Sequence, residues 1–262
     1  MSWLCKKEHG EALSSNSWFI RFRKSPAAEI RLFCFPYAGG SAAVFRTWEQ
    51  EYPGAIEVFS AQLPGRGSRY HECVYRRLSP LIDAIFEGIY PYLDRPFALF
   101  GHSLGGLLVF ELARRLRRKG GPAPVRLFAS ACNAPQIPDR SDPISTLPDD
   151  EFLSALKRLN GTPDDILENE ELMALMLPTV RADFEVFETY RYSYEPAFDF
   201  PITVFGGLHD VRVSRMGLEG WSFQTNSDFT LNLLPGDHFF IHSCQAPLLG
   251  LIAKDLDKSQ KV

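Results

Sequence analysis

The sequence of 262 residues contains few cysteines and no long apolar run. Its five cysteines are scattered and never spaced as Cys-x-x-Cys, so we expect reduced, mostly buried thiols rather than a disulfide framework. The apolar runs fall well short of the roughly 20 residues that cross a bilayer, and residues 1–17 lack the apolar segment of a secretory signal. These absences predict a cytoplasmic protein that does not associate with membranes.

Basic residues are not in excess either. The chain has 28 Lys and Arg against 32 Asp and Glu, a net charge of −4, so we expect no nucleic-acid partner. It has no His-Glu-x-x-His motif and no Cys/His pair at metal-ligand spacing, and Gly39-Gly40-Ser41 lacks a P-loop lysine. We therefore expect neither a metal nor a cofactor. The length suits one large domain, with a monomer as the default.

Short, continuous apolar runs alternate with helical stretches along most of the chain. We expect strands over 30–35, 56–63, 97–100, 125–131, 202–205 and 229–234, and helices over 43–51, 78–93, 104–119 and 246–256. Strands that are apolar throughout, each followed by a helix, predict a mainly parallel central sheet with helices on both faces.

Two segments depart from this alternation. Residues 139–196 contain no convincing strand; they predict a helical insertion with helices over 147–159 and 164–190 and a kink or break at Pro178. Residues 1–28 are polar and mixed in charge apart from Trp18-Phe19-Ile20. We expect them to form a loose N-terminal lead-in to a domain over residues 29–262.

Gly101-His102-Ser103-Leu104-Gly105 is a Gly-x-Ser-x-Gly motif between a predicted strand and a predicted helix. That context is typical of the nucleophile elbow of an α/β-hydrolase fold, where a tight turn exposes the serine hydroxyl. The alternative is a glycine-rich turn whose serine only caps the helix.

A serine nucleophile needs a base, and the base needs an acid that orients it. Asp210 and His238 each follow a later predicted strand, in the chain order Ser, Asp, His of this fold. We therefore expect Ser103, Asp210 and His238 to form the catalytic triad. His242 is the alternative base, and Asp237 and Asp183 are alternative acids that rank below Asp210.

The oxyanion of an acyl-transfer intermediate needs two backbone N–H donors. We expect the N–H of Leu104 to be one, because it begins the helix after Ser103. The other should come from the loop after the first predicted strand, with Ala38 favoured over Tyr37. The basic helix end over 114–119 is interpreted as a solvated face, or alternatively as a landing patch for an acidic partner.

Five stretches of the chain resemble one family. They are Phe35-Pro36-Tyr37-Ala38-Gly39-Gly40-Ser41, Leu63-Pro64-Gly65-Arg66, Phe100-Gly101-His102-Ser103-Leu104-Gly105-Gly106, Leu177-Pro178-Thr179-Val180-Arg181-Ala182-Asp183-Phe184 and Pro235-Gly236-Asp237-His238-Phe239. The sequence is similar to type II thioesterases, the stand-alone editing hydrolases of polyketide and nonribosomal peptide synthesis, which are related to medium-chain fatty-acyl carrier-protein hydrolases.

The resemblance implies the α/β-hydrolase fold, the triad Ser103, Asp210 and His238, and a mobile helical lid over residues 139–196. It implies hydrolysis of an acyl or aminoacyl thioester on phosphopantetheine, which the substrate itself carries, presented by a transiently bound carrier protein. Release of medium-chain fatty acyl groups is an alternative that uses the same mechanism. A general carboxylesterase, which would need no carrier protein, is another.

Overall fold

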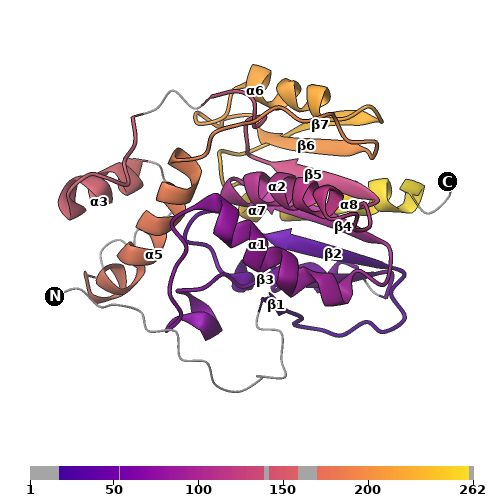
Figure 1. Ribbon diagram of the computed structural model, residues 1–262, viewed down its shortest axis with the longest axis horizontal. Helices are drawn as coiled ribbons and strands as arrows, with labels where there is room; N and C mark the ends of the chain where they lie inside the picture. The colour runs from indigo at the N-terminus through magenta and orange to yellow at the C-terminus, as the bar shows by residue number, and fades with distance from the viewer. Residues whose placement is uncertain (1–17, 53, 139–141, 159–169, 260–262) are drawn as a thin grey trace.

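The protein is built around one twisted, seven-stranded sheet (Figure 1). The computed structural model describes residues 18–52, 54–138, 142–158 and 170–259. The strands are β1 (Phe19–Ile20), β2 (Ile30–Phe35), β3 (Ile56–Ala61), β4 (Phe97–His102), β5 (Arg126–Ser130), β6 (Ile202–Gly207) and β7 (Phe229–Leu234). Their order is β1-β3-β2-β4-β5-β6-β7, and every pair is parallel except β1 with β3. The mainly parallel sheet predicted from the sequence is confirmed.

Helices cover both faces of the sheet. They are α1 (Leu78–Ile89), α2 (Leu104–Arg118), α3 (Asp149–Arg158), α5 (Glu170–Glu188), α6 (Arg215–Glu219), α7 (Phe240–Ser243) and α8 (Gln245–Ser259). Figure 1 shows α1 and α2 on one face and α8 on the other. None of the helices in the described part of the chain is sufficiently long and apolar to cross a membrane.

The strands are apolar throughout because both faces are buried. Along β2, Phe33 and Phe35 pack into the core beneath α1 and α2, whereas Leu32 and Cys34 pack into the core beneath α8. Successive side chains of a strand point to opposite faces, so each face receives every second residue. Each parallel strand also ends at the same edge of the sheet, where the functional side chains gather.

The lead-in predicted for residues 1–28 is wrong for Phe19 and Ile20. These residues form β1, which pairs with Ala61 and Ser60 of β3 in antiparallel register. Phe19 is buried and its ring lies edge-on to that of Phe33, with centroids 5.1 Å apart. Burial of this aromatic side chain holds the segment against the sheet. Residues 1–17 lie outside the described residues.

The helix predicted over 43–51 is confirmed only in part. The segment forms two 3₁₀ helices, η1 (Ala42–Phe45) and η2 (Trp48–Gln50). Phe45 and Trp48 are both fully buried, with ring centroids 4.9 Å apart, and both rings lie against Phe100. Each short helix thus contributes one ring to the same part of the core.

The predicted insertion contains α3 and α5, at the end of the molecule opposite α8 in Figure 1. Both pack through a small apolar cluster that includes Phe152, Leu156, Met173 and Val180. Instead of breaking at Pro178, α5 continues through it. Because Met173 and Val180 lie on either side of the proline, their packing holds the helix together there. Residues 159–169 lie outside the described residues.

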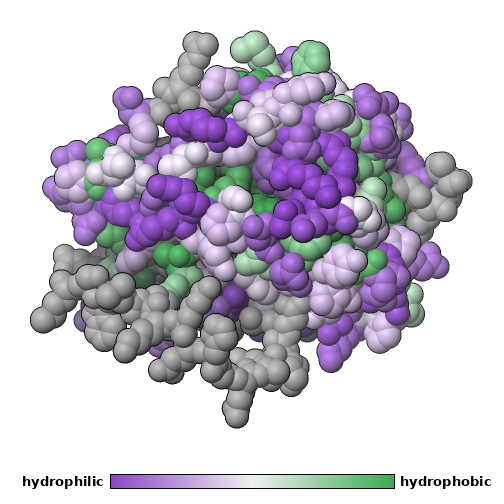
Figure 2. All heavy atoms as spheres, viewed as in Figure 1, coloured by the Kyte–Doolittle hydropathy of each residue, from purple (hydrophilic) through white to green (hydrophobic). Residues whose placement is uncertain are grey.

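Ion pairs occupy much of the basic end of α2. Arg114, which is 1% exposed, pairs with Glu111 and Glu195, and Arg117 and Arg118 also pair with Glu195. Arg115 pairs with a carboxylate of α1. Hydrophilic side chains cover much of the face over α1 and α2 (Figure 2). The arginines therefore fasten the segment after α5 to α2, and an acidic partner for this helix end stays a prediction.

The cysteines only partly match the expectation. Cys34, Cys132 and Cys244 are free, buried thiols. Burial raises the pKa of Cys132 to about 12 and that of Cys34 well above its ordinary value, which keeps both protonated and unreactive. Cys73 differs, because it is exposed and disulfide-bonded.

Candidate active site

Ser103 lies in a strained turn between β4 and α2. Its φ of 55° and ψ of −116° are unusual for a residue with a side chain. The turn is possible because Gly101 and Gly105 lack side chains: a Cβ on Gly101 would lie 2.0 Å from the Gly105 carbonyl oxygen, and one on Gly105 would lie 2.1 Å from that of Phe35. The Ser103 side chain makes no capping hydrogen bond to α2, so the capping alternative is wrong.

Two hydrogen bonds link Ser103 to the two other predicted triad residues. His238 Nε2 lies 3.0 Å from Ser103 Oγ, and His238 Nδ1 lies 2.8 Å from Asp210 Oδ2. The carboxylate can only accept, so Nδ1 carries the proton and Nε2 is free to accept from the serine hydroxyl. The other carboxylate oxygen accepts the backbone N–H of Arg212 at 2.8 Å. Ser103, Asp210 and His238 thus come together from the ends of three strands.

The electrostatics of the site favour a neutral base beside a charged acid. Burial lowers the pKa of His238, although its hydrogen bond to Asp210 opposes that change. Burial by itself would raise the pKa of Asp210, but the hydrogen bond from His238 holds it below its ordinary value. At neutral pH the imidazole is therefore unprotonated at Nε2, as a general base must be.

The alternative base and acids have other partners. His242 Nε2 lies 3.0 Å from the Tyr37 hydroxyl, and the Asp237 carboxylate accepts the N–H of Phe239 at 2.8 Å. Asp183 forms a buried ion pair with Arg66. Across the described residues, no group of three or more histidines, cysteines or carboxylates is placed to hold a metal ion.

His102, which had no predicted role, holds the backbone of His238 in place. It is fully buried, and its Nε2 lies 2.8 Å from the His238 carbonyl oxygen while its Nδ1 lies 2.9 Å from Ser130 Oγ. The carbonyl can only accept, so Nε2–H donates to it and Nδ1 accepts from the serine. Burial lowers the pKa of His102 well below its ordinary value. A neutral His102 thus fixes the backbone of His238. In the sequence, only its place in the Gly-x-Ser-x-Gly motif drew attention to it.

The predicted oxyanion donors lie at the wall of the pocket that contains Ser103. Ala38 and Leu104 both line that pocket. Ala38 belongs to a turn that is closed by a hydrogen bond of 2.9 Å from the Gly40 N–H to the Tyr37 carbonyl. Gly39 occupies the third position of the turn with a φ of +78°, which favours glycine.

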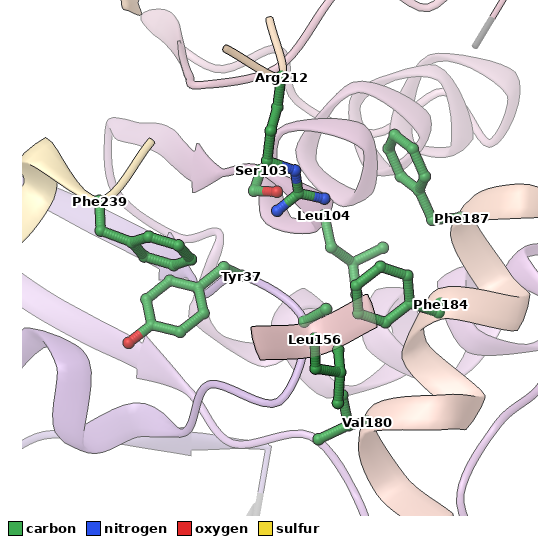
Figure 3. Close-up of a pocket in the computed structure, with 10 residues that line it drawn as sticks. Tyr37, Ser103, Leu104, Leu156, Val180, Phe184, Phe187, Arg212 and Phe239 are labelled. Carbon is green, nitrogen blue, oxygen red and sulfur yellow. The ribbon is translucent and has the colours of Figure 1, made fainter. Parts of the chain in front are cut away.

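The pocket has a polar side and an apolar side. Figure 3 shows Arg212 extending toward Ser103 and Leu104, and the rings of Tyr37 and Phe239 next to each other. The insertion contributes Leu156, Val180, Phe184 and Phe187 to the opposite wall. The empty space between the walls is about 540 Å³, including the part that is open to solvent. Arg212 was missed in the sequence, because an arginine in a loop gives no sign that it faces a pocket.

Comparison with known proteins places this site in a family. Residues 30–256 match the model of the thioesterase domain. The chain is 43% identical to the gramicidin S biosynthesis protein GrsT of Aneurinibacillus migulanus, covering 92% of this chain and 94% of that one. It is 32% identical to the human medium-chain S-acyl fatty acid synthase thioesterase, covering 83% of each.

Solved structures agree with this assignment. The type II thioesterase BorB from the borrelidin biosynthetic cluster superimposes with a TM-score of 0.85 at 33% identity, covering 94% of this chain and all of that one. The family match extends over nearly the whole sheet, from β2 to α8, and includes the elbow. The chain therefore belongs to the thioesterase family and has its α/β-hydrolase fold.

Proposed function

We propose that Ser103 is the nucleophile of a thioester hydrolase, with His238 as its general base and Asp210 as the residue that orients the base. The observation that carries the proposal is the chain of hydrogen bonds from Asp210 through His238 to Ser103. Membership of the thioesterase family supports the same reaction.

The proposed reaction has two stages, acylation of Ser103 and hydrolysis of the acyl-enzyme. Ser103 Oγ attacks the thioester carbonyl while His238 Nε2 takes its proton, and the N–H groups of Leu104 and Ala38 stabilise the oxyanion. The C–S bond then breaks, and the imidazolium returns the proton to the departing thiolate. A thiol with a pKa near 8.5 needs little help to leave. Water, deprotonated by His238, attacks the acyl-enzyme and releases the acid and Ser103.

We infer that the substrate is an acyl or aminoacyl thioester on the phosphopantetheine of a carrier protein, removed from stalled or misprimed synthases. The similarity to GrsT and BorB, whose names refer to biosynthetic pathways, supports this inference. Phosphopantetheine would arrive with the substrate, so no separate cofactor is needed. Transient binding of the carrier protein, a monomeric state and a cytoplasmic location stay predictions.

Release of medium-chain fatty acyl groups is the second candidate. The apolar wall formed by Leu156, Phe184 and Phe187 suits an alkyl chain, and the similarity to the human medium-chain enzyme points the same way. The two candidates differ in acyl preference, because an editing enzyme must accept short and varied groups whereas a release enzyme should select one range of chain length.

The test presents one acyl group in three ways: on a phosphopantetheinylated carrier protein, on coenzyme A and as a p-nitrophenyl ester. Wild type and Ser103→Ala are compared on each. Preference for the carrier-bound thioester, with turnover abolished in Ser103→Ala, supports the proposal. A large preference for the simple ester would instead indicate a general carboxylesterase, and full activity of Ser103→Ala would exclude the triad. Repeating the assay with acetyl to dodecanoyl groups separates editing from medium-chain release.

A further inference from the structure

A buried ion pair joins the insertion to the body of the protein. Arg66, in the loop after β3, donates to both oxygens of Asp183 on α5, with N–O distances of 2.6 and 2.8 Å. The two residues are 8% and 3% exposed. Removing two charges from water offsets much of their attraction, so a buried ion pair adds little net stability by itself. Its location therefore points to another role.

The ion pair holds the turn that carries the predicted oxyanion donor. Asp183 Oδ2 accepts the Gly39 N–H at 2.7 Å, and Arg66 Nη1 donates to the Gly40 carbonyl at 3.2 Å. The two charged groups thus bind one donor and one acceptor of the turn over 37–40. Gly39 follows Ala38 directly, so fixing its N–H fixes the peptide plane next to the Ala38 donor. Glycine is otherwise free to adopt many backbone conformations.

Neighbouring contacts make this connection rigid. Thr179 Oγ1, one turn before Asp183 on α5, donates to the Gly65 carbonyl at 2.8 Å. Val180 packs against the turn so closely that a Cβ on Gly39 would lie 3.0 Å from its Cγ2 atom. The Gln62 side chain donates to the Arg66 carbonyl at 2.8 Å. This part of α5 is thus bound to the loops beside the nucleophile.

We propose that Asp183 is a positioning residue for catalysis: through Gly39 it sets the place of the Ala38 N–H in the oxyanion hole. This inference rests on the proposed function. A neutral side chain would bind Arg66 and the Gly39 N–H more weakly, because hydrogen bonds to an ionised acceptor are roughly twice as strong as neutral ones. The turn would then deviate from the geometry that suits the oxyanion. Transition-state stabilisation falls while binding of the substrate, which has no oxyanion yet, changes little.

The test compares Asp183→Asn with Glu185→Gln. Glu185 is a matched control, because it is on the same helix and binds Arg76 and Arg77 at 2.9 and 2.5 Å, away from the turn. For each variant we would measure kcat, KM and the inhibition constant of an alkylboronic acid, whose tetrahedral serine adduct places an oxygen in the oxyanion hole. Asp183→Asn should lower kcat on the order of 10- to 100-fold and weaken boronate inhibition in parallel, with KM within about threefold. Glu185→Gln should change each value less than about threefold.

The outcomes separate this proposal from a merely structural role. A lower melting temperature with kcat and boronate affinity intact would overturn it, as would equal effects of Asp183→Asn and Glu185→Gln. If Asp183→Asn does not fold, Arg66→Lys takes its place. Lysine keeps the charge but loses the bidentate contact with Asp183, and we expect the same effects on kcat and boronate affinity. Failure of the proposed function would look different, because wild type itself would not cleave the thioester or Ser103→Ala would cleave it normally.

Discussion

The two walls of the pocket are built in different ways. On the sheet side, Ser103 lines the pocket, and hydrogen bonds connect it through His238 to Asp210; each of the three residues follows a strand. On the insertion side, Leu156 and Phe184 are apolar and held by packing. Strand ends in a shared sheet fix the reacting groups, whereas apolar contacts between helices can be exchanged at modest cost. The difference indicates that acyl preference can change without loss of the chemistry, except where Asp183 connects the two walls.

The largest effect should come from the base. His238→Ala removes the group that accepts the Ser103 proton, so kcat should fall on the order of 10⁴-fold or more. His242→Ala removes a hydrogen bond to Tyr37 at the rim of the site and should change kcat less than about tenfold. Steady-state kinetics on an acyl-pantetheine thioester measures both. Equal losses in the two variants would contradict the assignment of His238 as the base. They would also contradict the conclusion that the sheet side of the pocket holds the reacting groups.

The next largest effect should be on stability. Gly105→Ala would place a Cβ 2.1 Å from the carbonyl oxygen of Phe35. This oxygen is a backbone atom, so no side-chain rotation can relieve the clash. We expect a loss of more than about 3 kcal/mol in the free energy of unfolding. Gly250→Ala, on an exposed part of α8 where the new Cβ meets nothing within 4 Å beyond its chain neighbours and the nearby helix backbone, should instead gain roughly 0.5–1 kcal/mol. Urea denaturation measures both values, and a tolerated Gly105→Ala would show that the elbow is less constrained than its geometry indicates.

The insertion side is expected to control selectivity. Phe184 lines the pocket and packs edge-on against Phe152, with centroids 5.8 Å apart. Phe184→Ala should lower kcat/KM about tenfold for a decanoyl thioester, because apolar contact with the chain is lost, and hardly at all for an acetyl thioester. Leu175→Ala, on the same helix but 53% exposed, is the control and should affect neither. A uniform loss across chain lengths would indicate that Phe184 only supports the fold.

The same comparison explains what the sequence could predict. The elbow and the positions of Asp210 and His238 follow local rules: a tight turn requires glycines, and parallel strands end at one edge of the sheet. The sheet-side residues therefore stand out in the sequence. Apolar periodicity also predicted the two insertion helices, but not which of their residues, such as Leu156 and Phe187, face the pocket rather than each other.

The features that were missed depend on contacts distant in sequence. Arg66 and Asp183 are 117 positions apart, and no local pattern relates them, although both lie in stretches that carry the family resemblance. Phe19 pairs with β3, so its place in the sheet depends on a strand some 40 residues later. The 3₁₀ turns at Phe45 and Trp48 arise because core packing overrides helical preference. Burial and pairing of this kind become visible only in three dimensions.

The smallest expected effect concerns Arg212, the charged residue of the pocket. Burial lowers the pKa of His238 below its ordinary value, the bond to Asp210 opposes this, and the positive charge of Arg212 lowers it further. Since only neutral His238 accepts the proton, kcat/KM should fall at acidic pH with an inflection below 6.5. In Arg212→Gln the positive charge is gone, the pKa of His238 rises, and the inflection should move to higher pH.

The pH profile of kcat/KM between pH 4.5 and 9 measures this shift, with an uncharged acyl thioester so that the substrate does not titrate. Arg215→Gln is the matched control, because Arg215 is 73% exposed and pairs with Glu219 on the surface; its profile should overlay that of wild type. If the inflection of Arg212→Gln does not move, the Arg212 charge does not act on the base. Arg212 would then act on substrate selection, as the insertion side of the pocket does. Its removal should in that case alter acyl preference at every pH.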